Sequence, residues 1–219
     1  MHRLVRTCLA AALVATALGT AAGPASAERW WGRDKAGDVR QLTISLDPPP
    51  CGSVDVTPAP QDTSTDLVGL SVVHDGDSVV LRAHLRGYRA PGTDRGLEFD
   101  LATEGRDYQV SVSTWGRQGP PVVELATAPT EPQPAGCNSY VTSQTSVPCD
   151  GMRLSFRPAR GVVDVTVPRT CVGDPRWVRA GAHSERLLGD RGRIDVWGRT
   201  DVGTILDAPP LSPRVRHSR

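Results

Sequence analysis

Three aspartates, Asp34, Asp38 and Asp66, have the residue type and positions to bind a metal ion. Asp34 and Asp38 lie four residues apart in one polar segment, and Asp66 opens an apolar strand pattern over 68–72, on its apolar face. An ionised carboxylate on that face is costly unless it is hydrogen-bonded, paired with arginine or bound to a cation. We therefore expect Asp66 to be structural. Either backbone N–H groups or an arginine satisfy it, or it shares a structural Ca²⁺ with Asp34 and Asp38.

A second pair of carboxylates, Glu98 and Asp100, is predicted on the outer face of a strand, with the two residues about 7 Å apart. Such a pair could serve glycoside hydrolysis, although the same pattern is common on solvated strand surfaces. The chain has no G-x-S-x-G and no H-E-x-x-H motif, and none of its cysteines is expected to be a free nucleophile. We therefore expect no enzyme activity, no catalytic residue and no cofactor other than the calcium.

The histidines show no arrangement typical of a metal site. The strand pattern sends His74 to the apolar face and His84 to the opposite face, so the two cannot share a metal. His183 has no acidic or thiol residue near it in sequence at ligand spacing.

The cysteines of the predicted mature chain are even in number, which favours two disulfides in an exported protein. They are Cys51, Cys137, Cys149 and Cys171. Apolar alternation over 152–156 and over 163–167, around a turn at 158–161, predicts a hairpin that brings Cys149 within one residue of Cys171. This register favours the pair Cys149–Cys171 and, by elimination, Cys51–Cys137. The alternative is a short local loop that joins Cys137 to Cys149.

The remaining patterning predicts an all-β protein, because no stretch shows a sustained period of 3.6 residues. Asp75-Gly76 predicts a two-residue type I′ turn that places Val72 opposite Val79. Another hairpin is predicted between 97–101 and 108–112. Three hairpins with one apolar face each predict an antiparallel two-sheet β-sandwich stapled by disulfides, over residues 28–206.

The first 27 residues have the features of a Sec-type signal peptide. Two arginines precede an apolar run over 9–22, which is too short to span a membrane, and Ala25-x-Ala27 offers a cleavage site. We expect cleavage after Ala27 and an extracellular protein. The chain has no second apolar run of this kind, so we expect no transmembrane segment.

The charge of the chain after such a cleavage is close to balanced. Removal of residues 1–27 leaves 23 of the 25 basic residues and all 24 acidic ones, so neither nucleic acid nor an anionic membrane is expected as a partner. Residues 207–219 are rich in proline, arginine and serine, and we expect a flexible, poorly packed basic tail there.

Two segments resemble known protein groups. The pattern over 34–39, followed by Asp66-Leu67 and a His-Asp-Gly-Asp turn, resembles the start of β-sandwich modules of the DOMON-like and family-nine carbohydrate-binding type. The segment 167–179 is similar to a recurring segment of uncharacterised secreted proteins of actinomycetes. The first resemblance implies a sandwich that binds sugar, and the second implies a compact disulfide-bonded sandwich.

The expected function is therefore a secreted, non-enzymatic binding module with a polysaccharide of the cell envelope or medium as its ligand. Trp30, Trp31 and Trp115 are candidates for a sugar-stacking platform, although packing at sheet edges is another use for such rings. The alternative is a structural or protein-interaction protein of the cell surface. A glycan hydrolase is the more distant alternative.

Overall fold

The computed structural model describes residues 28–45, 53–87, 95–113, 121–130, 133–136, 139–141, 143–201 and 208–217. Three of the predictions fall outside these ranges. They are the signal peptide with its cleavage after Ala27, the pairing of Cys51 with Cys137, and the exposed position of Trp115.

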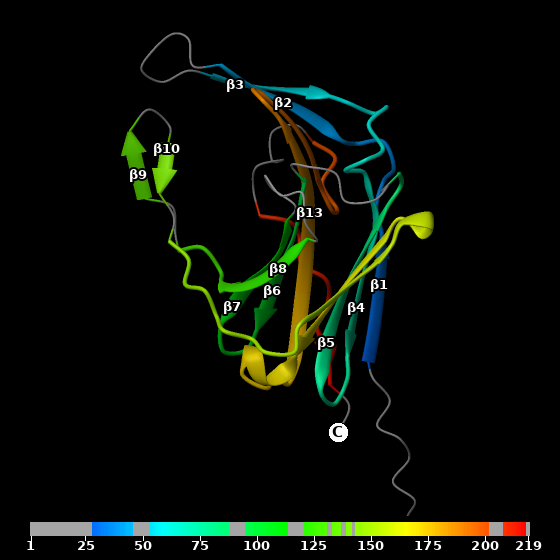
Figure 1. Ribbon diagram of the computed structural model, residues 1–219, viewed down its shortest axis with the longest axis vertical. Helices are drawn as coiled ribbons and strands as arrows, with labels where there is room; N and C mark the ends of the chain where they lie inside the picture. The colour runs from blue at the N-terminus through cyan, green and yellow to red at the C-terminus, as the bar shows by residue number, and fades with distance from the viewer. Residues whose placement is uncertain are drawn as a thin grey trace, which may run out of the picture.

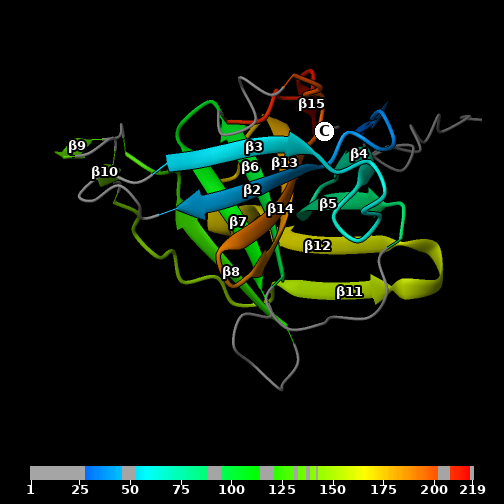
Figure 2. The ribbon, with the colours of Figure 1, turned by 90° about the horizontal axis from the view of Figure 1, so that it is seen from above.

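One sheet has five antiparallel strands in the order β1-β4-β5-β12-β11. Its strands are β1 (Glu28–Arg33), β4 (Leu67–His74), β5 (Ser78–Leu85), β11 (Arg153–Arg157) and β12 (Val162–Pro168). The 3₁₀ helix η1 (Pro158–Arg160) closes the β11–β12 turn, and η2 (Arg169–Val172) follows β12. Figure 2 shows β11 and β12 side by side at the lower right.

The other large sheet has eight strands, seven of them in the order β3-β2-β14-β13-β6-β7-β8, with β15 paired to β13. They are β2 (Arg40–Ser45), β3 (Ser53–Pro58), β6 (Arg95–Thr103), β7 (Asp107–Ser113), β8 (Val122–Thr127), β13 (Trp177–Leu188), β14 (Arg191–Val196) and β15 (Val215–Arg216). A separate ribbon of β9 (Gln133–Gly136) and β10 (Ser139–Val141) lies away from both sheets (Figure 1).

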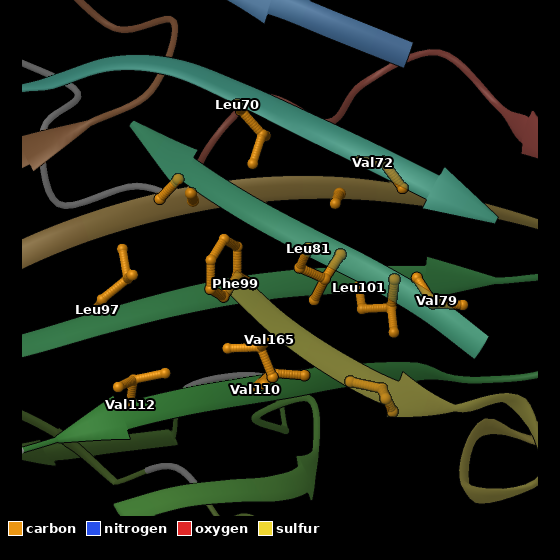
Figure 3. Close-up of a cluster of buried hydrophobic side chains, with 14 of the residues drawn as sticks. Leu70, Val72, Val79, Leu81, Leu97, Phe99, Leu101, Val110, Val112 and Val165 are labelled. Atoms are coloured by element: carbon orange, nitrogen blue, oxygen red, sulfur yellow. The ribbon is translucent and has the colours of Figure 1, made fainter. Parts of the chain in front are cut away.

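The hydrophobic core lies between the two large sheets. Leu70 of β4 and Leu81 of β5 face Phe99 of β6 and Val110 of β7, and all four side chains are fully buried (Figure 3). The alternation of buried and half-buried residues along these strands reflects their period of two. Two packed antiparallel sheets with a disulfide confirm the predicted fold class.

The β4–β5 hairpin has the predicted face but not the predicted register. His74 pairs with Val79, and Val72 pairs with Leu81 rather than with Val79. The turn is centred one residue further along the chain than predicted, because the Asp75 N–H donates to the Ser78 carbonyl oxygen at 3.0 Å, and the Asp75 carboxylate accepts the backbone N–H of Asp77 (3.0 Å) and Ser78 (2.7 Å). Neither Asp75 nor Gly76 has a positive φ, so the type I′ prediction is wrong. Since the register shift is two residues, the apolar side chains still face the core.

The other two hairpins match the sequence patterns. Phe99 pairs with Val110, and Phe156 pairs with Val163. The register of the β11–β12 hairpin brings Cys149 close to Cys171, and the two form a disulfide with an S–S distance of 2.04 Å. The preferred pairing of these two cysteines is thus confirmed.

The segment 208–217 packs against the sandwich, so the predicted poorly packed tail is wrong for these residues. Val215 and Ser212 are buried, and the Ser212 hydroxyl accepts a hydrogen bond from the Ala180 N–H at 3.0 Å. Gly181 permits this contact, because a Cβ there would lie 2.8 Å from Cγ of Pro209. Within the described ranges, no helix has the length and hydropathy that crossing a membrane requires.

Candidate functional site

Three buried carboxylates converge at one end of the sandwich. Asp38, Asp66 and Asp195 are 3%, 0% and 0% exposed. Each can present one oxygen such that the three oxygens all lie within 4.8 Å of one another. Two of these residues, Asp38 and Asp66, belong to the predicted metal-binding set.

The three residues come from both sheets and from the crossing between them. Asp66 immediately precedes β4 of the five-stranded sheet, whereas Asp195 lies in β14 of the eight-stranded sheet. Asp38 lies in the segment that leads from β1 in one sheet to β2 in the other. The cluster therefore forms only when the two sheets pack.

Some of the carboxylate oxygens are held by hydrogen bonds and others are not. Oδ2 of Asp66 accepts the N–H of Gly37 at 2.9 Å and forms an ion pair with Nε of Arg86 at 2.7 Å. Oδ2 of Asp195 accepts the N–H of Leu67 at 2.7 Å. The other oxygen of each residue is buried and accepts no hydrogen bond from another described residue, and the same holds for both oxygens of Asp38.

Burial makes ionisation of this cluster unfavourable. It is the largest cause that raises the pKa of Asp195 to about 8, and the nearby carboxylates of Asp38 and Asp34 add to the effect. Burial also raises the pKa of Asp38 and of Asp66. Carboxylates that face one another in a low-dielectric site hold their protons unless a cation neutralises them.

Asp34, the third predicted ligand, lies beside the cluster rather than within the set of converging oxygens. Its Oδ1 accepts the N–H of Lys35 at 2.8 Å and its Oδ2 accepts the N–H of Gly198 at 3.0 Å. Burial is the largest cause that raises its pKa to about 6, and Asp38 and Asp66 contribute to that rise. Asp34 thus adds negative potential at the cluster, while its own two oxygens accept the backbone N–H groups of Lys35 and Gly198.

The sequence did not predict Asp195 as a site residue, because the period-of-two pattern of its strand places Asp195 on the side away from the core. Ile194 and Val196 flank it and look like the core-facing residues of the strand. They pack instead with Leu42 and Val56 in a second small cluster on the opposite face of the sheet. This leaves Asp195 facing the five-stranded sheet.

The second carboxylate pair, Glu98 and Asp100, lies on the opposite face of the eight-stranded sheet. His183 is directly across from Glu98, with its Nε2 3.4 Å from Oε2 of Glu98. Burial, with a contribution from Asp100, raises the pKa of Glu98 to about 7, whereas burial lowers the pKa of His183. The expectation that His183 has no acidic partner was wrong, because strand pairing supplies Glu98, which is remote in sequence, and Glu185, two residues along the same strand, also acts on His183.

A pocket of about 400 Å³ opens where β13 begins and β15 pairs with it. Arg176, Trp177, Arg216 and His217 are its described lining residues. The guanidinium carbon of Arg214 lies 4.4 Å from the centroid of the Trp177 ring. The pocket thus combines an indole ring with several cationic side chains.

The acidic groups near this pocket are used mainly in backbone contacts. Glu104 accepts the backbone N–H groups of Arg176 (2.7 Å) and Trp177 (3.4 Å), and it is also 3.5 Å from Nε of Arg176. Glu28 accepts the backbone N–H of Arg216. Among the described residues, the guanidinium groups of Arg214 and Arg216 form no ion pair.

The other predicted side chains are placed as follows. His74 is buried on the apolar face, as expected, and its Nδ1 lies 3.1 Å from the Val215 carbonyl oxygen. Trp30 packs edge-on against Trp197 with ring centroids 5.4 Å apart, while Trp31 is 48% exposed. Trp30 and Trp31 therefore do not form one platform.

Comparison of the chain with protein-family models, with curated proteins and with solved structures finds no match.

Proposed function

We propose that this chain is a secreted, non-enzymatic binding module that holds an anionic polysaccharide at the Trp177 pocket. The observation that carries the proposal is the pocket itself, with its volume of about 400 Å³ and its lining of Arg176, Trp177, Arg216 and His217. A volume of this size is within the range of small-molecule sites. The Cys149–Cys171 disulfide supports the secreted location, because disulfides persist in oxidising compartments.

The chemistry of the lining favours a sugar with a carboxylate or sulfate group. An indole ring offers an apolar face on which the C–H groups of a sugar can pack. A guanidinium group binds a carboxylate or sulfate through two parallel N–H donors. Three arginines, at positions 176, 214 and 216, surround Trp177 against the two carboxylates of Glu28 and Glu104, so the pocket is net positive.

Calorimetric titration with two polymers tests the proposal. A polyuronate such as polygalacturonate should bind, whereas neutral dextran should not, and added salt should weaken the binding. Arg216→Gln and Trp177→Ala should each reduce the affinity at least tenfold. The matched control is Arg153→Gln, an exposed arginine on β11 remote in sequence from the pocket, and it should bind as the unchanged protein does. Equal affinity for both polymers, or unchanged binding by both pocket variants, would contradict the proposal.

A glycan hydrolase is the second candidate, favoured by the raised pKa of Glu98 beside Asp100. An acid that keeps its proton near neutral pH next to a second carboxylate is the pairing that glycosidases use. The test is the release of reducing ends from the polyuronate. Turnover that Glu98→Gln abolishes would establish the hydrolase and overturn the non-enzymatic assignment.

A protein-interaction role is the third candidate, favoured by two exposed apolar residues. Ile44 of β2 and Val54 of β3 pair across the edge of the eight-stranded sheet and are 45% and 50% exposed. An exposed edge strand with apolar side chains can pair with another chain. The test is light scattering at increasing concentration. Self-association that Val54→Lys abolishes would support this role.

A further inference from the structure

We propose that Asp38, Asp66 and Asp195 together bind one Ca²⁺ ion that joins the two sheets. The proposal goes beyond the polysaccharide pocket, because it concerns different residues and does not depend on any sugar being bound. Its basis is that oxygens from three buried carboxylates lie within 4.8 Å of one another.

The unpartnered oxygens point to a ligand that is not part of the chain. Both oxygens of Asp38, Oδ1 of Asp66 and Oδ1 of Asp195 are buried and accept no hydrogen bond from another described residue. A buried polar atom without a partner destabilises the folded state, and more so when the group is charged. Four such atoms in one cluster indicate that a bound ligand, rather than another group of the chain, interacts with them in the folded protein.

The charge balance favours a dication. Three carboxylates face one another, and among the described residues Arg86 is the one cation in an ion pair with them. Lys35 and Arg40 also lower the pKa of Asp38, but among the described residues neither forms an ion pair with the three carboxylates. Three carboxylates less the ion-paired Arg86 leave two negative charges in the cluster, and Asp34 adds further negative potential. One divalent ion would neutralise this excess.

The donor set and its spacing favour Ca²⁺ over other divalent ions. All the donors are carboxylate oxygens, which suit hard cations, whereas zinc and copper prefer nitrogen and sulfur. Ca²⁺ binds oxygen at about 2.3 to 2.6 Å, so two of its ligands can be at most about 5 Å apart, and the 4.8 Å spread fits within that limit. Mg²⁺ usually takes one or two protein carboxylates and keeps several waters. A cluster of three buried carboxylates is more typical of Ca²⁺.

The position of the ligands gives the ion a mechanical role. Asp66 and Asp195 belong to different sheets, and Asp38 lies in the segment that connects them. An ion bound to all three would therefore oppose separation of the sheets. Because these residues are far apart in sequence, the unfolded chain cannot offer the same site, so binding stabilises the folded state.

Metal analysis and calorimetry of the purified full chain test the proposal. The protein is stripped with a chelator, dialysed and equilibrated with about 1 mM CaCl₂, the range in which extracellular calcium modules bind. We expect one Ca²⁺ per chain by mass spectrometry. The melting temperature should rise with Ca²⁺ and rise much less with Mg²⁺ at the same concentration.

Two variants assign the ion to this cluster. Asp195→Asn and Asp38→Asn should each weaken Ca²⁺ binding at least tenfold. Asp38→Asn is expected to fold even if Asp195→Asn does not, because the Asp38 oxygens accept no hydrogen bond from another described residue. The matched control is Asp164→Asn, an aspartate of β12 that pairs with Arg82 and Arg157, and its Ca²⁺ affinity should be unchanged.

Two results would overturn the proposal. One is a stripped protein that takes up no Ca²⁺ and shows the same melting temperature with and without it. The other is Asp38→Asn that melts at a higher temperature than the unchanged protein while Ca²⁺ affects neither, because the cluster would then be neutralised by protons. Polyuronate binding at the Trp177 pocket could persist in either case, so failure of this proposal is distinct from failure of the proposed function.

Discussion

Oδ2 of Asp195 accepts a hydrogen bond of 2.7 Å from the backbone N–H of Leu67, and this bond links the two sheets. Asp195 lies in the eight-stranded sheet, whereas Leu67 is the first residue of β4 in the five-stranded sheet. The carboxylate of Asp66 lies one residue away in sequence and is oriented by Gly37 and Arg86. The end of the sandwich that holds these groups is thus built from polar contacts, while its centre is apolar.

Asp66→Ala should destabilise the fold by about 1 to 3 kcal/mol, because the Gly37 N–H and the Arg86 guanidinium lose their partner. Urea denaturation of the two proteins measures the loss. Asp55→Ala, at an exposed position of β3, is the control and should change little. An unchanged stability of Asp66→Ala would show that this carboxylate is not structural.

Removal of the disulfide by Cys149→Ala with Cys171→Ala should cost about 3 kcal/mol. The bond closes a loop of 22 residues, and chain entropy predicts a cost of this size for such a loop. Thermal unfolding of the double variant, compared with the oxidised and the reduced unchanged protein, measures it. A double variant as stable as the oxidised protein would contradict the prediction.

Gly161→Ala should destabilise the β11–β12 turn by at least about 1 kcal/mol. Gly161 has a φ of +62°, and a Cβ there would lie 2.0 Å from the carbonyl oxygen of Leu85. Gly105→Ala is the control, since beyond its two chain neighbours no heavy atom lies within 4 Å of the position of its Cβ. If the two alanine variants unfold at the same urea concentration, the close approach of residue 161 to the Leu85 carbonyl oxygen does not affect stability, and the prediction is wrong.

The pH dependence of stability should reveal the raised pKa of Glu98. The folded protein holds this proton more tightly than the unfolded chain, because the pKa rises from 4.5 to about 7 on folding. The resulting stabilisation is complete below about pH 4.5 and is lost as the pH rises through about 7. Over that window the unchanged protein should lose stability relative to Glu98→Gln, which cannot ionise at this position. Denaturation curves of the two proteins at several pH values test it, and parallel pH profiles would refute it.

The sequence predicted the core faces and two of the three hairpin registers, because strict apolar alternation determines them. It failed where polar side chains decide the geometry. The turn lies one residue further along the chain than the Asp-Gly pair suggests, with the Asp75 carboxylate accepting two backbone N–H groups in it, and the β4–β5 register is shifted by two residues.

The candidate sites were only partly predictable for a related reason. Asp38 and Asp66 could be found near the start of the chain, but Asp195 joins them only through the packing of the two sheets. The Trp177 pocket likewise depends on the pairing of β15 with β13, which brings Arg216 beside Trp177. Contacts between remote segments leave no local signal in the sequence.

The most direct test of the polysaccharide-binding proposal is a two-dimensional ¹H–¹⁵N spectrum of the tryptophan indole N–H groups during titration with a short oligogalacturonate. Five tryptophans give five resolvable signals, and single Trp→Phe variants assign them. The account predicts that the Trp177 signal shifts in proportion to binding while that of Trp31, which is 48% exposed on β1, does not move. The account would be contradicted if, at a saturating concentration of oligogalacturonate, the Trp177 signal does not shift or the Trp31 signal shifts instead.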